Sequence, residues 1–246
     1  MRDHWPLTSQ RPAWESSGLN FLARSVEEAC LLGAPLSLVG TDEVLRQSCD
    51  QLERVRERLT KLSAHEAFFL LKNSLAIPRL QYVLRTTPSC LSTQADRLDE
   101  VVRGTLSSVV NLKLDDRAWT QASLPVRWGG VGVRKPTALA PSAFLASASA
   151  AAPWIARLLP EERIPLSPDN LLAGAAVRWS RLAGRAVPSG HEAISQRAVD
   201  DGISLAISNE LFVQADPANR ARLLASFTPG SGAWLQAFFA AALAYA

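Results

Sequence analysis

The chain has 246 residues, of which 48% are hydrophobic and 20% charged, and its formal net charge at pH 7 is +3. This length is sufficient for one large domain or two small ones with a buried core, and the apolar fraction excludes a wholly disordered chain. Three separated cysteines exclude a disulfide scaffold, and neither a signal peptide nor an apolar run of the roughly 18 residues that a membrane span needs is present, so we expect an intracellular protein, nuclear or cytoplasmic, without a membrane partner.

The N-terminal quarter contains breakers, a short apolar run and one amphipathic pattern. Residues 1–26 are polar and rich in Pro and Ser, which predicts a poorly ordered lead-in. Residues 30–36 are apolar but contain Gly33 and Pro35, which favours a strand or a turn. A helix should follow, capped at Thr41 or Asp42. Its apolar stripe recurs every three or four positions: Leu45, Cys49, Leu52, Val55, Leu59 and Leu62.

Two further helices are predicted before residue 110. Residues 64–77 are apolar on almost all sides, so we expect this helix to be the most deeply buried element, and Pro78 should end or bend it. The next helix should start near Ser92 and Thr93. Its inner face repeats with helical spacing: Ala95, Leu98, Val102, Leu106 and Val109.

The second half of the chain also has a helical pattern. A loop over residues 111–116 leads to Trp119 and to a glycine-rich turn over residues 128–132. Ala and Ser are abundant from residue 136 to about residue 160, which fits closely packed helices, and residues 160–168 are a linker candidate. Helices are expected over residues 168–186, 191–213 and 217–225. Because strand-like alternation is almost absent, we predict a mostly α fold.

The charge distribution leaves nucleic-acid binding open. Residues 62–135 carry ten Lys or Arg and six Asp or Glu, a net charge of +4, so the rest of the chain sums to −1. Of the 26 basic residues 22 are Arg, whose planar guanidinium binds phosphate oxygens in pairs. GC-biased coding explains the same composition equally simply.

No active site is visible in the sequence. The pairs Asp115–Asp116 and Asp200–Asp201 lack the strand context of a two-metal enzyme, so we interpret the first as a helix cap and the second as part of a solvated helix face. Three His and three Cys without a close pair predict no zinc site, and no cofactor motif is found. The seven Trp residues could stack on bases, but we expect burial in the core for three of them: Trp119, Trp154 and Trp179.

Several segments carry a specific resemblance. They are Leu-Leu-Gly-Ala-Pro-Leu at residues 31–36, residues 68–85, and Trp-Thr-Gln-Ala-Ser-Leu-Pro-Val-Arg-Trp-Gly-Gly-Val-Gly-Val-Arg at residues 119–134, continued by residues 139–148, 195–201 and 220–237. Together they resemble the region C-terminal to the reverse transcriptase palm in non-LTR (LINE-type) retrotransposon polyproteins. The resemblance covers about residues 27–237.

This resemblance implies an architecture and a missing activity. It implies a multi-helix thumb-like bundle over residues 27–135, a helical linker domain over residues 136–237 and an aberrant tail over residues 238–246. Polymerisation in that family depends on an aromatic-x-Asp-Asp motif upstream of the Leu-Gly strand, and the residues before that strand contain none. We therefore expect no enzyme, but a fragment of a reverse transcriptase polyprotein that lacks the polymerase active site.

A thumb of this family contacts template and product, which implies weak binding to the backbone of RNA or of an RNA/DNA duplex, with a reverse transcriptase palm as a protein partner. The alternative is a retained host module that binds nucleic acid or protein, and a third hypothesis is an enzyme fragment that needs a palm in trans. The candidate nucleic-acid contacts lie in the matching motifs: Lys72, Arg79, Arg85, Arg127, Arg134 and Lys135.

Overall fold

The computed structural model describes residues 29–158, 171–188 and 195–235. Of these residues 74% are helical and 2% lie in strands, so the mostly α prediction is confirmed. Three predicted segments fall outside the described residues: the lead-in over residues 1–26, the linker over 160–168 and the tail over 238–246. The apolar run at residues 30–36 forms a minimal antiparallel hairpin, β1 (Cys30–Leu31) and β2 (Ala34–Pro35).

The two amphipathic helices of the first half pack against each other. Helix α1 (Leu38–Leu59) and helix α4 (Ala95–Val109) bury the predicted stripes, except that Val55 is half-buried and Leu62 lies beyond the end of α1. The predicted cap of α1 is wrong by one turn, because the Oγ atom of Ser37 accepts a hydrogen bond from the Gly40 amide (2.9 Å). Asp42 instead accepts hydrogen bonds from Ser92 and Thr93, just before α4.

The segment expected to be the most buried helix is divided into three parts. Helix α2 (Ala64–Leu70) continues as a π-helical turn (Leu71–Leu75), and helix α3 (Ile77–Thr86) begins with Pro78 in its first turn. Proline suits that position because the first amides of a helix have no acceptor within it. The burial prediction is wrong, since Leu70 is 38% exposed and only part of the segment faces the core.

A short helix and the glycine-rich turn connect the two halves of the chain. Helix α5 (Asp116–Ala122), which the sequence analysis did not predict, is capped as expected by Asp115, which accepts a hydrogen bond from the Ala118 amide (2.7 Å). A 3-10 turn (Val126–Trp128) follows it, with Gly129 at a φ of 72°. Gly130 packs so closely that a Cβ atom there would lie 2.0 Å from the carbonyl oxygen of Leu124. The predicted turn is therefore confirmed, and it needs glycine.

The helices predicted beyond residue 136 are all present. They are α6 (Pro136–Leu158), α7 (Leu171–Ala183), α8 (Gln196–Val213) and α9 (Pro217–Phe227), with a final 3-10 turn (Ala233–Leu235). Small side chains such as Ala140 and Ala143 let the first half of α6 approach its neighbours closely, and this half is among the most deeply buried segments described. By length and composition α6 is also the one described helix that could cross a membrane, although 39% of its apolar window is buried inside the protein.

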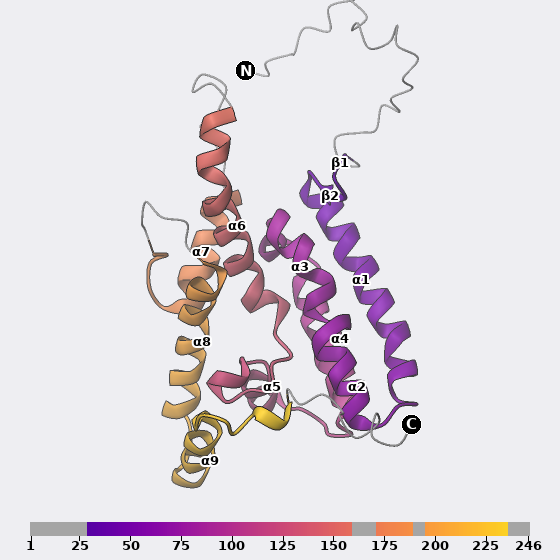
Figure 1. Ribbon diagram of the computed structural model, residues 1–246, viewed down its shortest axis with the longest axis vertical. Coiled ribbons are helices and arrows are strands. Elements are labelled where there is room, and N and C mark those ends of the chain that lie inside the picture. The colour runs from indigo at the N-terminus through magenta and orange to yellow at the C-terminus, as the bar shows by residue number, and fades with distance from the viewer. Residues whose placement is uncertain (1–28, 159–170, 189–194, 236–246) are drawn as a thin grey trace, which may run out of the picture.

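Figure 1 shows α1 to α4 on one side, α6 to α8 on the other, and α5 and α9 at one end. Helix α6 packs against α3 and α4 as well as against α7 and α8. One core cluster accordingly combines Leu45, Leu84 and Leu98 with Ala143 and Ala175. Hydrophobic contacts thus cross residue 135, and the division into a thumb-like and a linker region stays a prediction.

Candidate nucleic-acid interface

Arg134, a predicted nucleic-acid contact, forms a buried ion pair with Asp200 of α8. Its Nη1 and Nη2 atoms donate to the two carboxylate oxygens at 2.7 and 2.6 Å. The Arg134 side chain is only 14% exposed and that of Asp200 only 8%. The interpretation of Asp200 as part of a solvated helix face is therefore wrong. The charge of Arg134 is paired with Asp200 inside the protein and does not face a ligand.

Arg127 is engaged in the same way at the neighbouring position of α8. It forms an ion pair with Asp201, and the indole Nε1 of Trp128 donates to the same carboxylate oxygen at 3.1 Å. Partial burial opposes ionisation of Asp201, but the hydrogen bonds from Arg127 and Trp128 outweigh it, so the pKa of this carboxyl lies below its usual value. The two ion pairs, Arg134 with Asp200 and Arg127 with Asp201, therefore connect the glycine-rich segment to α8.

The two predicted lysines are half-buried and face other parts of the chain. The Nζ atom of Lys135 donates to Oγ1 of Thr120 at 3.0 Å and lies 5.7 Å from the ring centre of Trp119. The Nζ atom of Lys72 lies 3.4 Å from the carbonyl oxygen of Leu235 and 5.8 Å from the ring centre of Phe68. Burial lowers the pKa of both ammonium groups.

Arg79 and Arg85 on α3 are the two predicted contacts that face solvent freely. Both are exposed, and neither has a hydrogen bond or ion pair within the described ranges. Helix α3 is joined to the start of α8 by a hydrogen bond of 2.9 Å between the side-chain amides of Gln81 and Gln196. The accessible candidates therefore lie close to a second helix that the sequence analysis did not consider.

The first turn of that second helix belongs to a part of the described chain without carboxylates. Residues 67–95 contain no Asp or Glu, and neither do the described residues between Asp116 and Asp200. These segments form α3, α6, α7 and the first turn of α8, and α6 packs against the other three helices. We call them the carboxylate-free region. Its second segment contains nine basic residues: Arg117, Arg127, Arg134, Lys135, Arg157, Arg178, Arg181, Arg185 and Arg197.

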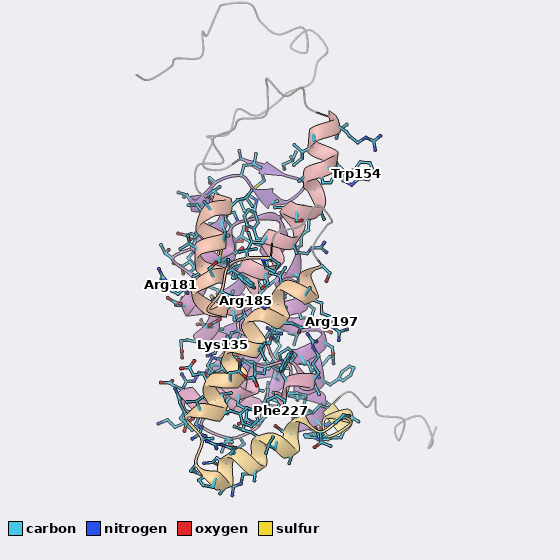
Figure 2. The ribbon with its side chains drawn as sticks, turned by 90° about the vertical axis from the view of Figure 1, so that its left-hand side faces the viewer. Lys135, Trp154, Arg181, Arg185, Arg197 and Phe227 are labelled. Atoms are coloured by element: carbon cyan, nitrogen blue, oxygen red, sulfur yellow. The ribbon has the colours of Figure 1, made fainter. Side chains whose placement is uncertain are left out.

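Three of these arginines extend the candidate interface beyond the sequence prediction. Arg181 on α7, Arg185 just after α7 and Arg197 on α8 are exposed, and Figure 2 shows them on the side of the molecule that α7 and α8 form. The guanidinium of Arg185 also lies 5.9 Å from the ring centre of Trp179. The sequence analysis missed them because they lie outside the net-positive span. The absence of Asp and Glu from the helices that carry these arginines was the sequence signal that could have indicated them. The connecting residues outside the described ranges do contain acidic residues: Glu161, Glu162, Asp169 and Glu192.

The carboxylates of the described residues lie mainly on α1, on α4 and at the start of α5, where arginines pair with them. Arg46 lies 2.7 Å from Glu43, Arg97 lies 2.9 Å from Asp50, and Arg103 lies 2.8 Å from Asp116. Opposite charges largely cancel on that side. Arg54 and Arg58 on α1 are exposed without an ion pair among the described residues, and so are Arg79, Arg85 and Arg181. The last three lie in segments without carboxylates, where a polyanion would be attracted.

An apolar cavity lies apart from these arginines, between α2, α4 and the C-terminal 3-10 turn. Its volume is about 440 Å³. Its lining is almost wholly apolar and includes Phe68, Leu106, Leu112 and Trp234, with His65 at one edge. Such a hollow suits an apolar side chain or ligand and offers nothing to a phosphate group.

The described residues offer little for covalent or metal chemistry. No group of three or more His, Cys, Asp or Glu side chains comes together in them. Cys49 and Cys90 are buried, and burial raises the pKa of the Cys90 thiol to about 11, which keeps it protonated and unreactive. Cys30 is exposed on the hairpin. The unpaired arginines are therefore the feature with the clearest binding chemistry.

Comparison of the chain with protein-family models, with curated proteins and with solved structures finds no match. The class that fold and surface define is a helical protein with several exposed arginines that form no ion pair among the described residues. The LINE-type resemblance continues to depend on the quoted sequence segments alone.

Proposed function

We propose that this chain is a non-catalytic helical module of the LINE-type thumb and linker class, which binds the backbone of RNA or of an RNA/DNA duplex weakly and without sequence preference. The observation that carries the proposal is the carboxylate-free region with its exposed arginines. The proposed contacts are Arg79 and Arg85 on α3, Arg181 on α7, Arg185 just after α7, and Arg197 on α8.

The physical argument concerns long-range attraction rather than base recognition. Arginines without carboxylate partners exchange water and counterions for phosphate oxygens, whereas a paired arginine must first lose its partner. Released counterions make such binding strongly dependent on salt. If three to five phosphates are neutralised, affinity should fall by about 40- to 500-fold between about 50 and 200 mM salt.

The test is a titration of labelled RNA and RNA/DNA duplexes at several salt concentrations. The double variant Arg181→Gln/Arg197→Gln removes two exposed arginines for which no hydrogen bond or ion pair is found among the described residues. It should weaken binding and reduce the salt slope by about 2 units, since each lost phosphate contact removes close to one unit. The matched control is Arg58→Gln/Lys61→Gln, which removes two exposed cations at the other end of the charge distribution, near the end of α1. Equal losses in the two double variants, or a flat salt response, would contradict the proposal.

A second candidate function is the interaction module with a protein partner. It is favoured by the apolar cavity beside Phe68 and by the hairpin, on which Leu31 is 62% and Leu32 89% exposed. In the LINE-type reading a palm domain is the partner that would cover the hairpin. Salt-independent binding of a protein, together with no binding of either nucleic acid at low salt, would favour this second function.

A further inference from the structure

Trp154 is an exposed aromatic side chain on a helix where the sequence analysis predicted burial. Trp119 and Trp179 are buried as expected, at 3% and 0% exposure, but Trp154 is 61% exposed, so its predicted burial is wrong. It lies on the second half of α6, beyond the part that packs against α7 and α8 through Ala138 and Ala146. The packing of the described residues does not account for this large side chain.

Among the described residues, one cationic side chain lies beside Trp154. The guanidinium of Arg157, one turn further along α6, lies 5.1 Å from the centre of the Trp154 ring. Helix α6 contains no Asp or Glu, and neither does α7, which packs beside it and carries Arg181. Figure 2 shows Trp154 at the far end of α6, with Arg181 on α7 and Arg185 just after α7 further down the molecule.

We propose that Trp154, supported by Arg157, stacks on unpaired bases, so that the carboxylate-free region binds single-stranded nucleic acid in preference to duplex. This inference rests on the proposed function and adds a choice of substrate. In a duplex each base is already stacked between its neighbours, and only the backbone and groove edges are accessible. A single strand presents base faces, on which an exposed indole can stack regardless of sequence.

The charge around the indole distinguishes this ligand from a protein partner. Ile155 is 44% and Leu158 79% exposed, so apolar contact area is available beside Trp154. A protein partner would need only that apolar area. A nucleic acid also uses the guanidinium over the ring, because Arg contributes both a cation–π contact and a phosphate contact. The described residues of α6 and α7 contain no Asp or Glu, and this favours the nucleic acid.

The experiment compares one oligonucleotide in single-stranded and duplex form at low salt, with Trp154→Ala, Trp154→Phe and a matched control. Trp154→Ala should weaken single-strand binding by about 5- to 150-fold for one stacked base and leave duplex binding within about 2-fold. Trp154→Phe should retain most of the single-strand affinity. The control Trp234→Ala removes an indole of equal exposure, 63%, outside the carboxylate-free region and should leave both affinities unchanged.

The other outcomes separate this inference from the proposed function. If Trp154→Ala leaves single-strand binding intact, or weakens both forms equally, while salt-dependent binding persists, stacking at Trp154 is overturned and backbone binding stands. If Trp154→Ala alters only self-association, measured by light scattering, the indole is a protein contact and the inference is also overturned. If the wild-type protein binds neither form at low salt, the proposed function fails and stacking fails with it. Thermal unfolding of each variant checks that a loss of affinity is not a loss of structure.

Discussion

Replacing Arg134 by methionine should destabilise the protein because it leaves the Asp200 carboxylate buried without its partner. The two side chains are 14% and 8% exposed, so solvent screens their interaction little. Both carboxylate oxygens of Asp200 accept from the Arg134 guanidinium, at 2.6 and 2.7 Å, and both contacts are lost together. Methionine restores some of the volume but none of the charge.

The magnitude follows from the burial of the pair. Removing one partner of a buried ion pair typically costs about 3–5 kcal/mol, a large fraction of the roughly 5–15 kcal/mol that stabilise a folded domain. For a protein of this size each kcal/mol lowers the melting temperature by about 2–4 °C, so a decrease of roughly 6–20 °C is expected. Calorimetry and urea unfolding monitored by circular dichroism both measure it.

Two further variants show whether the buried charge is the cause. Arg46→Met breaks an exposed pair with Glu43, whose side chains are 47% and 48% exposed, and should cost less than about 1 kcal/mol. The double variant Arg134→Met/Asp200→Leu removes both buried charges and should recover most of the stability lost in the single variant. The reasoning is refuted if Arg134→Met costs no more than Arg46→Met, or if the double variant is less stable than the single one.

Two other groups give predictions that depend on their burial. Burial raises the pKa of Asp99 to about 6 despite its hydrogen bonds from Thr137, and this value exceeds the 3.8 of the free side chain. The folded state therefore binds the Asp99 proton more tightly than the unfolded state does. The contribution of Asp99 to stability should be complete at low pH and lost as the pH rises through about 6. In the variant Asp99→Asn, the free energy of urea unfolding should vary less between about pH 4 and 7. In thiol titration Cys30 should react rapidly in the native protein, whereas Cys49 and Cys90 should react only after denaturation; fast native reaction of all three would contradict the buried positions.

Local periodicity predicted the helices whose burial is confined to one face. The stripes from Leu45 to Leu59 and from Ala95 to Val109 each identify one buried face, and α1 and α4 place these faces against each other. Residues 64–77 gave no such signal, because a segment that is apolar on all sides does not indicate which side is buried or where the helix breaks. The apolar surface that is exposed there includes Leu70, the last residue of α2, whereas Leu71 in the π-helical turn is buried.

Contacts between distant residues account for what the sequence did not predict at the candidate site. Asp200 follows Arg134 by 66 residues, and nothing in the surrounding helical pattern distinguishes a paired carboxylate from a solvated one. For Trp154 the prediction was burial, because an aromatic residue in an Ala-rich helix suggests a core position. The residue is exposed instead, because α6 extends beyond its neighbours there. Periodicity describes one element at a time, whereas pairing and exposure depend on which elements meet.

The glycine-rich segment, which is part of the LINE-type resemblance, has charges that are little available to a ligand. Arg127 and Arg134 lie in residues 119–134, and α8 holds both through Asp201 and Asp200. A sequence pattern that joins two parts of a fold restricts its residues as strongly as one that binds a ligand, because glycines and paired charges there tolerate little change. Within the proposed function, the glycine-rich segment is a structural junction that orients α8. Nucleic acid then meets the arginines that lack such partners, on α3, α7 and the first turn of α8.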